Sequence, residues 1–280
     1  MSTSLFAVFG HPIAHSLSPR IHAMFGAQFG IAIEYRRIQA DRAEFADRLD
    51  AFARDGGRAA NVTLPLKQDA ATHCIEVSDR ARRCGSVNTL TRTLYGWRGD
   101  STDGVGFLRD LRERHAFDPR GRSALLLGAG GAARAVAFAL AGEGVARLSI
   151  ANRTHARAEE LAEAIGARHV DAVAWDVLGS SRTFDLIVHA TAAGHESATF
   201  ASAHAPVAPQ TLCYDLSYGH AAAAFLFWAR AAGALRAVDG LGMLVEQAAE
   251  SFTIWHGRRP NTAPVHAGLR REMRPSLIGA

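Results

Sequence analysis

Short apolar runs alternate with longer amphipathic segments along most of the chain, a pattern typical of strands that alternate with helices. In the first hundred residues it predicts strands at 5–9, 33–38 and 59–64, and a strand or hairpin over 87–97. Helices are predicted at 18–29, with Ser18 as the cap and Pro19 at the first position, and at 42–54, 67–75 and 79–84.

A second series of alternating elements begins near residue 123. It predicts strands at 123–127, 147–151, 168–170, 185–190, 211–215 and 235–238, with helices at 131–141 and 154–165. A long helix over 241–255 follows the last strand, and we expect it to return to the first domain. The fold class is therefore α/β with parallel sheets and helices on both faces. The expected domains are 1–103 plus 240–280 for substrate, and a Rossmann domain at 104–239.

A glycine turn separates the first strand and helix of the second series. Gly128 and Gly130 lack a Cβ, so the backbone can turn tightly and a pyrophosphate can approach it closely. Small Ala133 lets helix and strand pack together, and the free N–H groups at the helix N-terminus favour anions. The turn indicates a dinucleotide site, although a tight strand-to-helix turn that binds nothing would have the same sequence.

The residues after the next strand indicate which dinucleotide is bound. An NAD site normally has Asp or Glu there to hold the ribose 2′-hydroxyl, whereas this chain has Arg153, Thr154 and Arg157. Two guanidiniums and a hydroxyl suit a 2′-phosphate, because arginine can donate two parallel hydrogen bonds to phosphate oxygens. The predicted cofactor is therefore NADP.

Composition limits the alternatives. The chain has 280 residues, 48% of them hydrophobic and 21% charged, and a formal net charge of +4 that is spread along the sequence. This distribution argues against a nucleic-acid partner, and the longest apolar run, at 221–229, is too short to span a membrane. Three cysteines without a CxxC motif suggest neither a disulfide framework nor a zinc site, and the chain begins without a signal-peptide pattern, so a cytoplasmic location is expected.

Polar residues that could act on a substrate gather after strands of the first domain. They include Ser16, Ser18, Thr63 and Asn88. Reduction of a ketone by hydride needs a proton donor for the oxygen, and Lys67 oriented by Asp103 would supply one. Taken singly, Lys67 would more often be a surface lysine and Asp103 a turn aspartate, but together with the cofactor site the acid/base pair is favoured.

Seven motifs in this order and spacing resemble the shikimate dehydrogenase family over essentially the whole chain. They lie at 10–19 (GHPIAHSLSP), 61–67 (NVTLPLK), 87–89 (VNT), 102–104 (TDG), 128–132 (GAGGA), 152–154 (NRT) and 239–248 (DGLGMLVEQA). The resemblance implies reversible NADPH-dependent reduction of 3-dehydroshikimate to shikimate, a step of aromatic amino-acid synthesis.

The resemblance also implies roles for individual residues. Lys67 is the implied acid/base residue, with Asp103 beside it, and Ser16 and Ser18 are implied to hold the substrate carboxylate. The rest of the implied substrate set is Thr63, Asn88, Asp103, Tyr218 and Gln247. The implied cofactor set is Gly128, Ala129, Gly130, Gly131, Ala132, Asn152, Arg153, Thr154, Arg157, Gly240 and Met243.

The chain departs from the usual family pattern in three places. His189 replaces the Asn that usually opens an Asn-Ala-Thr motif, although Thr191 and Gly194 remain. Ser101 replaces a common Asn, and residues 219–225 lack the usual Thr-Pro. These changes concern the wall expected beside the nicotinamide and leave the implied acid/base pair intact.

Two other functions stay open. A quinate/shikimate dehydrogenase of broader specificity would often use NAD, against which Arg153 and Arg157 argue. A non-catalytic NADPH-binding sensor would be expected to lack Lys67 or Asp103, and both are present. No metal is expected, because His11, His15 and His22 have no acidic companion. The sequence does not determine the assembly, and a homodimer is kept open.

Overall fold

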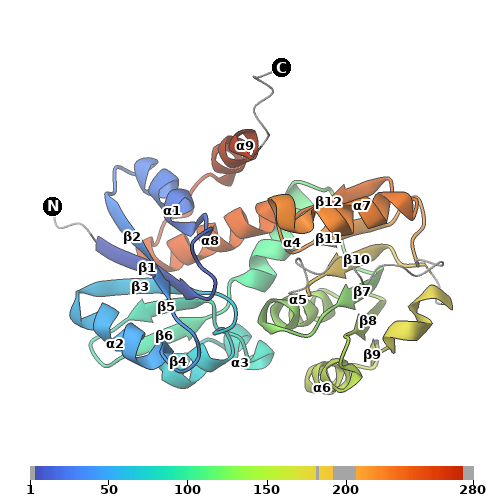
Figure 1. Cartoon of the computed structure of the whole chain (residues 1–280), viewed down its shortest axis with the longest axis horizontal. Coiled ribbons are helices and arrows are strands. Elements are labelled where there is room, and N and C mark those ends of the chain that lie inside the picture. Colours follow the sequence, from blue (N-terminus) through green and yellow to red (C-terminus); the bar gives the residue numbers. More distant parts are fainter. Residues whose placement is uncertain (1–3, 181–182, 192–205, 274–280) are drawn as a thin grey trace. The chain divides into compact units, whose positions relative to one another are not determined.

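The computed structural model describes residues 4–180, 183–191 and 206–273, and the chain divides into two compact units (Figure 1). The first unit comprises Met1–Gly106 and Leu244–Ala280, and the second comprises Phe107–Met243. The chain passes from one unit to the other within two helices, α4 (Asp103–Glu113) and α8 (Leu241–His256). The mixed α/β class with two sheets confirms the predicted fold class.

The first unit contains a six-stranded sheet in the order β2-β1-β3-β5-β6-β4. Its strands are β1 (Ser4–Gly10), β2 (Ile33–Gln39), β3 (Gly57–Val62), β4 (Cys74–Val77), β5 (Thr89–Arg92) and β6 (Trp97–Asp100). The predicted parallel arrangement is interrupted at β5, which runs antiparallel to both β3 and β6. Strands β5 and β6 form the hairpin that was one of the two alternatives predicted over 87–97. Only four residues join β5 to β6, and so short a connection permits a hairpin but no crossover.

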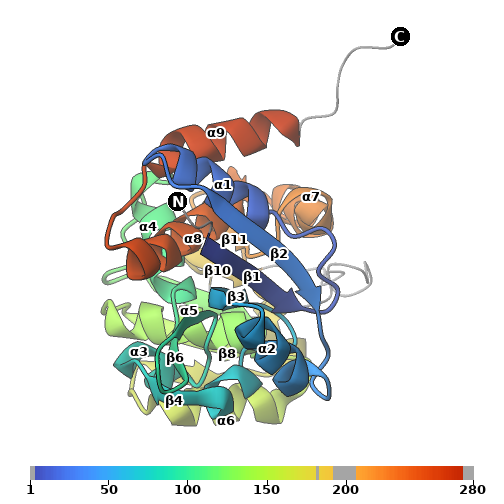
Figure 2. The same cartoon turned by 90° about the vertical axis from the view of Figure 1, so that its left-hand side faces the viewer.

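Helices cover both faces of this sheet (Figure 2). On one face, α2 (Phe45–Arg54) packs Phe45 and Phe52 against Phe9, with ring centroids 5.7 and 5.6 Å apart. On the other face lie α1 (Ser18–Ala27) and the first-unit part of α8, where Phe25 and Phe252 meet edge to face. The remaining helices are the 3₁₀ turn η1 (Asp69–His73), α3 (Asp79–Cys84) and α9 (Thr262–Glu272), the last of which was not predicted.

Two local predictions for the first unit are wrong. The segment 67–75 is not a helix, because only the short turn η1 forms and Ile75 belongs to strand β4, which pairs with β6. Ser18 is the first residue of α1 and not its cap, since Leu17 occupies the cap position. The Ser16 hydroxyl oxygen instead accepts a bond from the Ser18 N–H at 3.3 Å.

A buried histidine couples the stability of the first unit to pH. His22 is fully buried, and its ring stacks on Tyr35 with centroids 4.8 Å apart. Burial lowers the pKa of His22 from 6.5 to about 3. The unfolded chain therefore takes up a proton at this residue below about pH 6.5, whereas the folded chain does so only near pH 3, so acid favours unfolding across this window.

Because the unfolded chain binds this proton and the folded chain does not, we expect the free energy of unfolding to be about 2–3 kcal/mol lower at pH 4.5 than at neutral pH. His22→Phe keeps the ring but cannot be protonated, so its free energy of unfolding should fall less between pH 7 and pH 4.5 than that of the wild type. Urea unfolding at the two pH values measures the difference. His155→Phe, at an exposed position of the second unit, is the control and should keep the wild-type dependence. An unchanged dependence in His22→Phe would contradict the account.

The second unit contains a wholly parallel sheet in the order β12-β11-β10-β7-β8-β9. Its strands are β7 (Ser123–Leu127), β8 (Arg147–Ala151), β9 (Val170–Ala172), β10 (Leu186–His189), β11 (Leu212–Asp215) and β12 (Arg236–Val238). This is the doubly wound order of dinucleotide-binding folds, in which the direction of winding reverses between β7 and β10. The predicted strands of the second series are therefore all present, with boundaries that differ by at most two residues.

Both faces of this sheet are buried, which explains the continuous apolar runs in its strands. On one face Leu126 and Val188 pack with α5 (Gly131–Gly142) and α6 (His155–Ile165). On the other face Leu125 and Ile187 pack with α7 (Ala223–Ala231). Short 3₁₀ turns lie at η2 (Trp175–Ser180) and η3 (Gly219–Ala222). None of the helices in the described residues is long and apolar enough to cross a membrane.

The cysteines behave as packing residues. Cys84 and Cys213 are buried, and burial raises the pKa of the Cys213 thiol to about 12. A thiol with so high a pKa carries almost no thiolate at neutral pH, and the thiolate is the nucleophilic form. Both residues are therefore small core residues.

Candidate functional site

A buried ion pair lies at the centre of the first unit's polar residues. The Lys67 ammonium is 2.6 Å from Oδ2 of Asp103, and the two side chains are 13% and 4% exposed. Lys67 follows β3 by five residues, and Asp103 is the first residue of α4. The structure therefore brings together the two residues predicted to form the acid/base pair, which are 36 positions apart in the sequence.

The second oxygen of Asp103 is also held. Asn88, which is 2% exposed, donates from Nδ2 to Oδ1 of Asp103 at 2.9 Å and to Oε1 of Gln247 at 3.2 Å. The Asn88 Oδ1 accepts a bond from the Thr102 N–H at 2.8 Å, which fixes which end of the amide faces Asp103. Asp103 thus binds Lys67 through one oxygen and Asn88 through the other, so its carboxylate cannot rotate away from the ammonium.

A further set of polar residues, which was not predicted as part of the site, holds Asn88 in place. Thr89 donates its hydroxyl to Asn88 Oδ1 at 3.0 Å and lies 2.8 Å from the hydroxyl of Ser251 on α8. Asn61 donates to the Asn88 carbonyl oxygen at 3.1 Å and to Ser251 at 3.0 Å. Asn61 and Thr89 stand inside quoted motifs and were therefore visible, but no local pattern singles out Ser251.

A pair of serine hydroxyls lies at the start of α1. Ser16 donates its hydroxyl to that of Ser18 at 3.2 Å, and Ser18 is 5% exposed. The backbone carbonyl of Ser16 accepts two bonds from the guanidinium of Arg37, from Nε at 2.9 Å and Nη2 at 2.8 Å. Arg37, on β2, therefore fixes the loop that carries the serines. Arg37 was not predicted as a site residue, because an exposed arginine on a strand is common.

Thr63 is held close to the end of β1. Its N–H donates to the Phe9 carbonyl at 2.8 Å, and an added Cβ on Gly10 would lie 2.4 Å from its methyl group. Gly10, which opens the first of the seven motifs, is therefore required by this close packing. Thr63 itself is half-buried.

In the second unit, the glycine turn follows β7 directly. Gly128 has φ of +121°, and a Cβ there would lie 2.8 Å from the carbonyl oxygen of Ala190, so only glycine fits. Gly130 caps α5, and a Cβ on it would meet nothing within 4 Å. The backbone around Gly130 is thus open to approach by a ligand at the N-terminus of a 12-residue helix. Ala129, Gly131 and Ala132 are half-buried in the same turn.

The basic segment lies at the same edge of the sheet as the glycine turn. Leu127 pairs with Ala151, so β7 and β8 end side by side, and Asn152 begins the loop that leads to α6. Asn152 donates from Nδ2 to the carbonyl of Thr154 at 2.9 Å, which holds the loop closed. The side chains of Arg153, Thr154 and Arg157 are exposed there, and the first turn of α6 contains no acidic residue.

Three other predicted residues also belong to the second unit. Tyr218 is half-buried and follows β11 by three residues. Gly240 is buried, and a Cβ on it would lie 2.3 Å from the carbonyl oxygen of Leu216. Met243 is 6% exposed and belongs to the apolar core. Packing alone accounts for Gly240 and Met243 here, and contacts with a nicotinamide remain a prediction. Gly194 lies outside the described residues.

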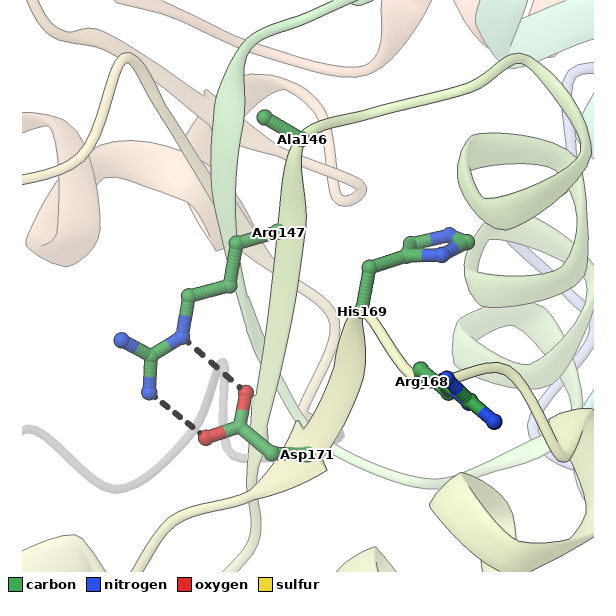
Figure 3. Close-up of a pocket in the computed structure, with 5 residues that line it drawn as sticks. All are labelled: Ala146, Arg147, Arg168, His169 and Asp171. Atoms are coloured by element: carbon green, nitrogen blue, oxygen red, sulfur yellow. Dashed lines mark hydrogen bonds and ion pairs between the residues drawn. The ribbon is translucent and has the colours of Figure 1, made fainter.

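A depression of about 540 Å³ lies elsewhere on the second unit. It is lined by Ala146, Arg147, Arg168, His169 and Asp171, at the beginning of β8 and β9 (Figure 3). Arg147 donates two bonds to Asp171, from Nη2 at 2.7 Å and Nε at 3.3 Å, so its charge is neutralised. The predicted cofactor residues follow the opposite ends of the strands, and none of them lines this depression.

Known families match most of the chain. A model described as shikimate dehydrogenase substrate binding domain matches residues 8–90. One described as shikimate / quinate 5-dehydrogenase matches 111–218, and one described as shikimate 5'-dehydrogenase C-terminal domain matches 240–270.

Individual relatives are similar over nearly their whole length. The shikimate dehydrogenase (NADP(+)) of Xylella fastidiosa (strain M12) is 52% identical over 275 residues, which cover 97% of this chain and 98% of the relative. That of Xanthomonas campestris pv. campestris (strain 8004) is 54% identical over 274 residues, which cover 96% of each chain.

A solved structure supports the same likeness. Shikimate 5-dehydrogenase from Thermus thermophilus, in complex with NADP(H) and shikimate, superposes with a TM-score of 0.83 at 35% identity. The match covers 96% of this chain and 99% of that one. The predicted family is therefore confirmed, and the predicted cofactor agrees with the names of these relatives.

Proposed function

The chain belongs to the shikimate dehydrogenase family, and we propose that it catalyses the reversible NADPH-dependent reduction of 3-dehydroshikimate to shikimate. In this role it would serve aromatic amino-acid synthesis. The observation that carries the proposal is the Lys67–Asp103 pair, together with one property of the sequence. Lys67 is the only lysine in the chain, which otherwise uses arginine for its positive side chains.

That single lysine has a chemical explanation. An ammonium can give up a proton and take it back, whereas an arginine guanidinium stays protonated in proteins. A chain that uses arginine everywhere else would have no reason to keep one lysine for charge alone. The ion pair with Asp103 then orients the ammonium, and its 13% exposure leaves part of it open to a substrate.

The proposed reaction divides the work among the residues. When bound, NADPH supplies the hydride that adds to the carbonyl carbon of the substrate. Lys67 gives its proton to the carbonyl oxygen as negative charge develops there, and takes it back in the reverse direction. Asp103 holds the ammonium in place. Ser16 and Ser18 bind the substrate carboxylate, and Thr63, Asn88, Asp103 and Gln247 bind its hydroxyl groups. Tyr218 is proposed to contact the substrate as well.

The second unit has a donor set that fits NADP. The open backbone at Gly130 and the N-terminus of α5 suit the pyrophosphate, since free N–H groups favour an anion. Arg153, Thr154 and Arg157 suit the 2′-phosphate, with Asn152 shaping their loop. Gly128, Ala129, Gly131 and Ala132 form the turn, and Gly240 and Met243 are proposed to lie beside the nicotinamide.

The absorbance of reduced nicotinamide tests the proposal. The purified enzyme is given shikimate or quinate, each with NADP and with NAD, and initial rates are compared. We expect shikimate with NADP to give the highest kcat/KM. The description shikimate / quinate 5-dehydrogenase favours a second candidate, which would turn over quinate at a comparable rate. Cofactor binding without turnover of either substrate would instead support a sensor.

Removal of one serine hydroxyl should weaken substrate binding selectively. A hydrogen bond to a charged group contributes about 1.5–3 kcal/mol, so we expect Ser18→Ala to raise KM for shikimate by roughly tenfold or more. KM for NADP should change little, because Ser18 lies in the other unit from the cofactor residues. Ser86→Ala is the matched control, since Ser86 is buried in the same unit and its hydroxyl has no partner among the described residues. An unchanged KM for shikimate in Ser18→Ala would show that Ser18 does not bind the substrate carboxylate.

Two further parts of the proposal concern the cellular location and the oligomeric state of the enzyme. A cytoplasmic location agrees with the absence of a disulfide between Cys74, Cys84 and Cys213, all three of which lie in the described residues. Homodimer formation is proposed from the family resemblance, and light scattering of the eluted protein during size-exclusion chromatography would measure it. A molar mass equal to that of one chain would contradict it.

A further inference from the structure

A buried hydrogen-bonded series joins the carboxyl ends of β10 and β11. Nδ1 of His189 is 2.9 Å from Oδ2 of Asp215, and its Nε2 is 2.6 Å from the hydroxyl of Thr191. The His189 and Asp215 side chains are 2% and 1% exposed. The imidazole stacks on Phe225 of α7, with ring centroids 4.9 Å apart and planes at 14°. The ring is therefore held on its edges and on one face.

These contacts determine which atoms carry protons. An ionised carboxylate only accepts hydrogen bonds, so Nδ1 of His189 must carry the proton that lies between it and Asp215. In a neutral ring, Nε2 then has a lone pair, and the Thr191 hydroxyl must donate its proton to Nε2. The Thr191 oxygen is then left with lone pairs only, and no other hydrogen bond to it is found among the described residues. Carboxylate, imidazole and hydroxyl follow one another in the same order as in hydrolytic triads, in which the carboxylate also selects the tautomer.

The position of Thr191 indicates what the oxygen would bind. His189 pairs with Leu127 in the sheet, and a Cβ on Gly128 would lie 3.1 Å from the Thr191 backbone nitrogen. Thr191 thus follows β10, beside the glycine turn that follows β7, where the strand order reverses. Dinucleotides bind across this reversal point, and Arg153 and Arg157 lie on the opposite side of β7, after β8. The nicotinamide half of the dinucleotide would therefore lie on the β10 side of β7.

We propose that Thr191 is a hydrogen-bond acceptor for an N–H or O–H group on the nicotinamide–ribose half of NADP. His189 and Asp215 are positioning residues that keep its hydroxyl proton turned inward. The proposal rests on the proposed function only in that NADP is the cofactor. It gives the unusual histidine at position 189 a role, because an imidazole locked by a carboxylate presents one defined lone pair to the threonine.

Substitutions at Thr191 test the acceptor directly. Thr191→Val keeps the shape and removes the oxygen, whereas Thr191→Ser keeps the oxygen. Affinities are measured by calorimetric titration with NADP and with adenosine 2′,5′-bisphosphate, which carries the adenine half and the 2′-phosphate but no nicotinamide. We expect Thr191→Val to weaken NADP binding by about two- to tenfold and to leave the bisphosphate unchanged. Thr191→Ser should bind NADP as the wild type does.

Asp215→Asn tests the positioning role without burying a new charge. The Ser217 N–H donates to Oδ1 of Asp215 at 2.7 Å, so the oxygen of an asparagine would stay there and its NH₂ would face His189. His189 would then have to carry its proton on Nε2 and donate it to Thr191, whose own proton would turn outward. We expect NADP binding to weaken as in Thr191→Val, with no further loss in the double variant.

The outcomes separate this inference from the proposed function. If the wild type binds neither ligand, the NADP site itself is wrong. If the wild type binds both NADP and the bisphosphate, and Thr191→Val weakens the binding of both equally or of neither, only the acceptor role of Thr191 is overturned. An Asp215→Asn protein that melts cooperatively and binds NADP like the wild type overturns the positioning role. If Asp215→Asn does not fold, the difference between Thr191→Val and Thr191→Ser decides.

Discussion

Lys67→Ala is expected to lower kcat for shikimate oxidation by about 10²–10⁴-fold, the usual contribution of a positioned proton-transfer group. The KM for shikimate should stay within a few-fold of the wild-type value, because the serine pair and the Asn88 network are untouched. Steady-state kinetics with shikimate and NADP measures both constants. A loss confined to KM would instead make Lys67 a binding group. Unchanged kcat and KM would show that Lys67 is only a surface charge.

Lys67→Arg is the matched control, because it keeps the positive charge beside Asp103 but cannot release a proton at neutral pH. We expect it to lose kcat about as severely as Lys67→Ala. Because Lys67→Ala leaves the Asp103 charge buried without its partner, its fold must be checked by circular dichroism. Full kcat in Lys67→Arg would show that charge suffices, and would contradict the role of proton donor.

Arg153→Ala should weaken the binding of NADP but not the binding of NAD. A charge-assisted hydrogen bond to phosphate contributes about 1.5–3 kcal/mol, which corresponds to roughly a 10- to 150-fold rise in Kd. This loss should affect NADP and adenosine 2′,5′-bisphosphate, and it should spare NAD, which has no 2′-phosphate.

The control for Arg153→Ala removes the same charge from elsewhere in the second unit. Arg168 is exposed and lies at the other edge of the sheet, just before β9 (Figure 3). Arg168→Ala should therefore leave the preference for NADP over NAD unchanged. An equal loss of affinity for NADP and for NAD in Arg153→Ala would show that Arg153 does not bind the 2′-phosphate.

The six strands of the second unit could all be predicted from the sequence, and the reason is local. Its strands are buried on both faces and read as continuous apolar runs, such as 124–127, and the glycine turn follows directly. The conformation of Gly128 is also a local property, since its φ of +121° is accessible to glycine at little cost.

The first unit was predicted less well, because distant partners determine its structure. Ile75 reads as the end of a helix, yet it lies in a strand that exists only because β6 offers an edge to pair with. The predicted hairpin alternative for 87–97 gives the antiparallel direction of β5 relative to β6, but the pairing of β5 with β3 depends on a distant segment. Periodicity within one segment contains no information about such pairing.

The candidate site shows the same division. Motifs identified Lys67, Asp103 and Asn88, whose spacing is typical of the family. They did not identify Ser251, which reaches Thr89 across 162 positions, or Arg37, which holds the carbonyl of Ser16. These residues act through another residue, so nothing in their own neighbourhood marks them. One overlooked signal was present in the composition, namely that the chain contains a single lysine.

The most direct test of the central claim follows the hydride itself. Shikimate that carries deuterium on the carbon bearing the oxidised hydroxyl is incubated with the enzyme and NADP, and the reduced cofactor is analysed by mass spectrometry. The account predicts that the NADPH formed carries the deuterium, at a rate that falls with kcat in Lys67→Ala. No reduced cofactor, or NADPH without deuterium, would contradict it.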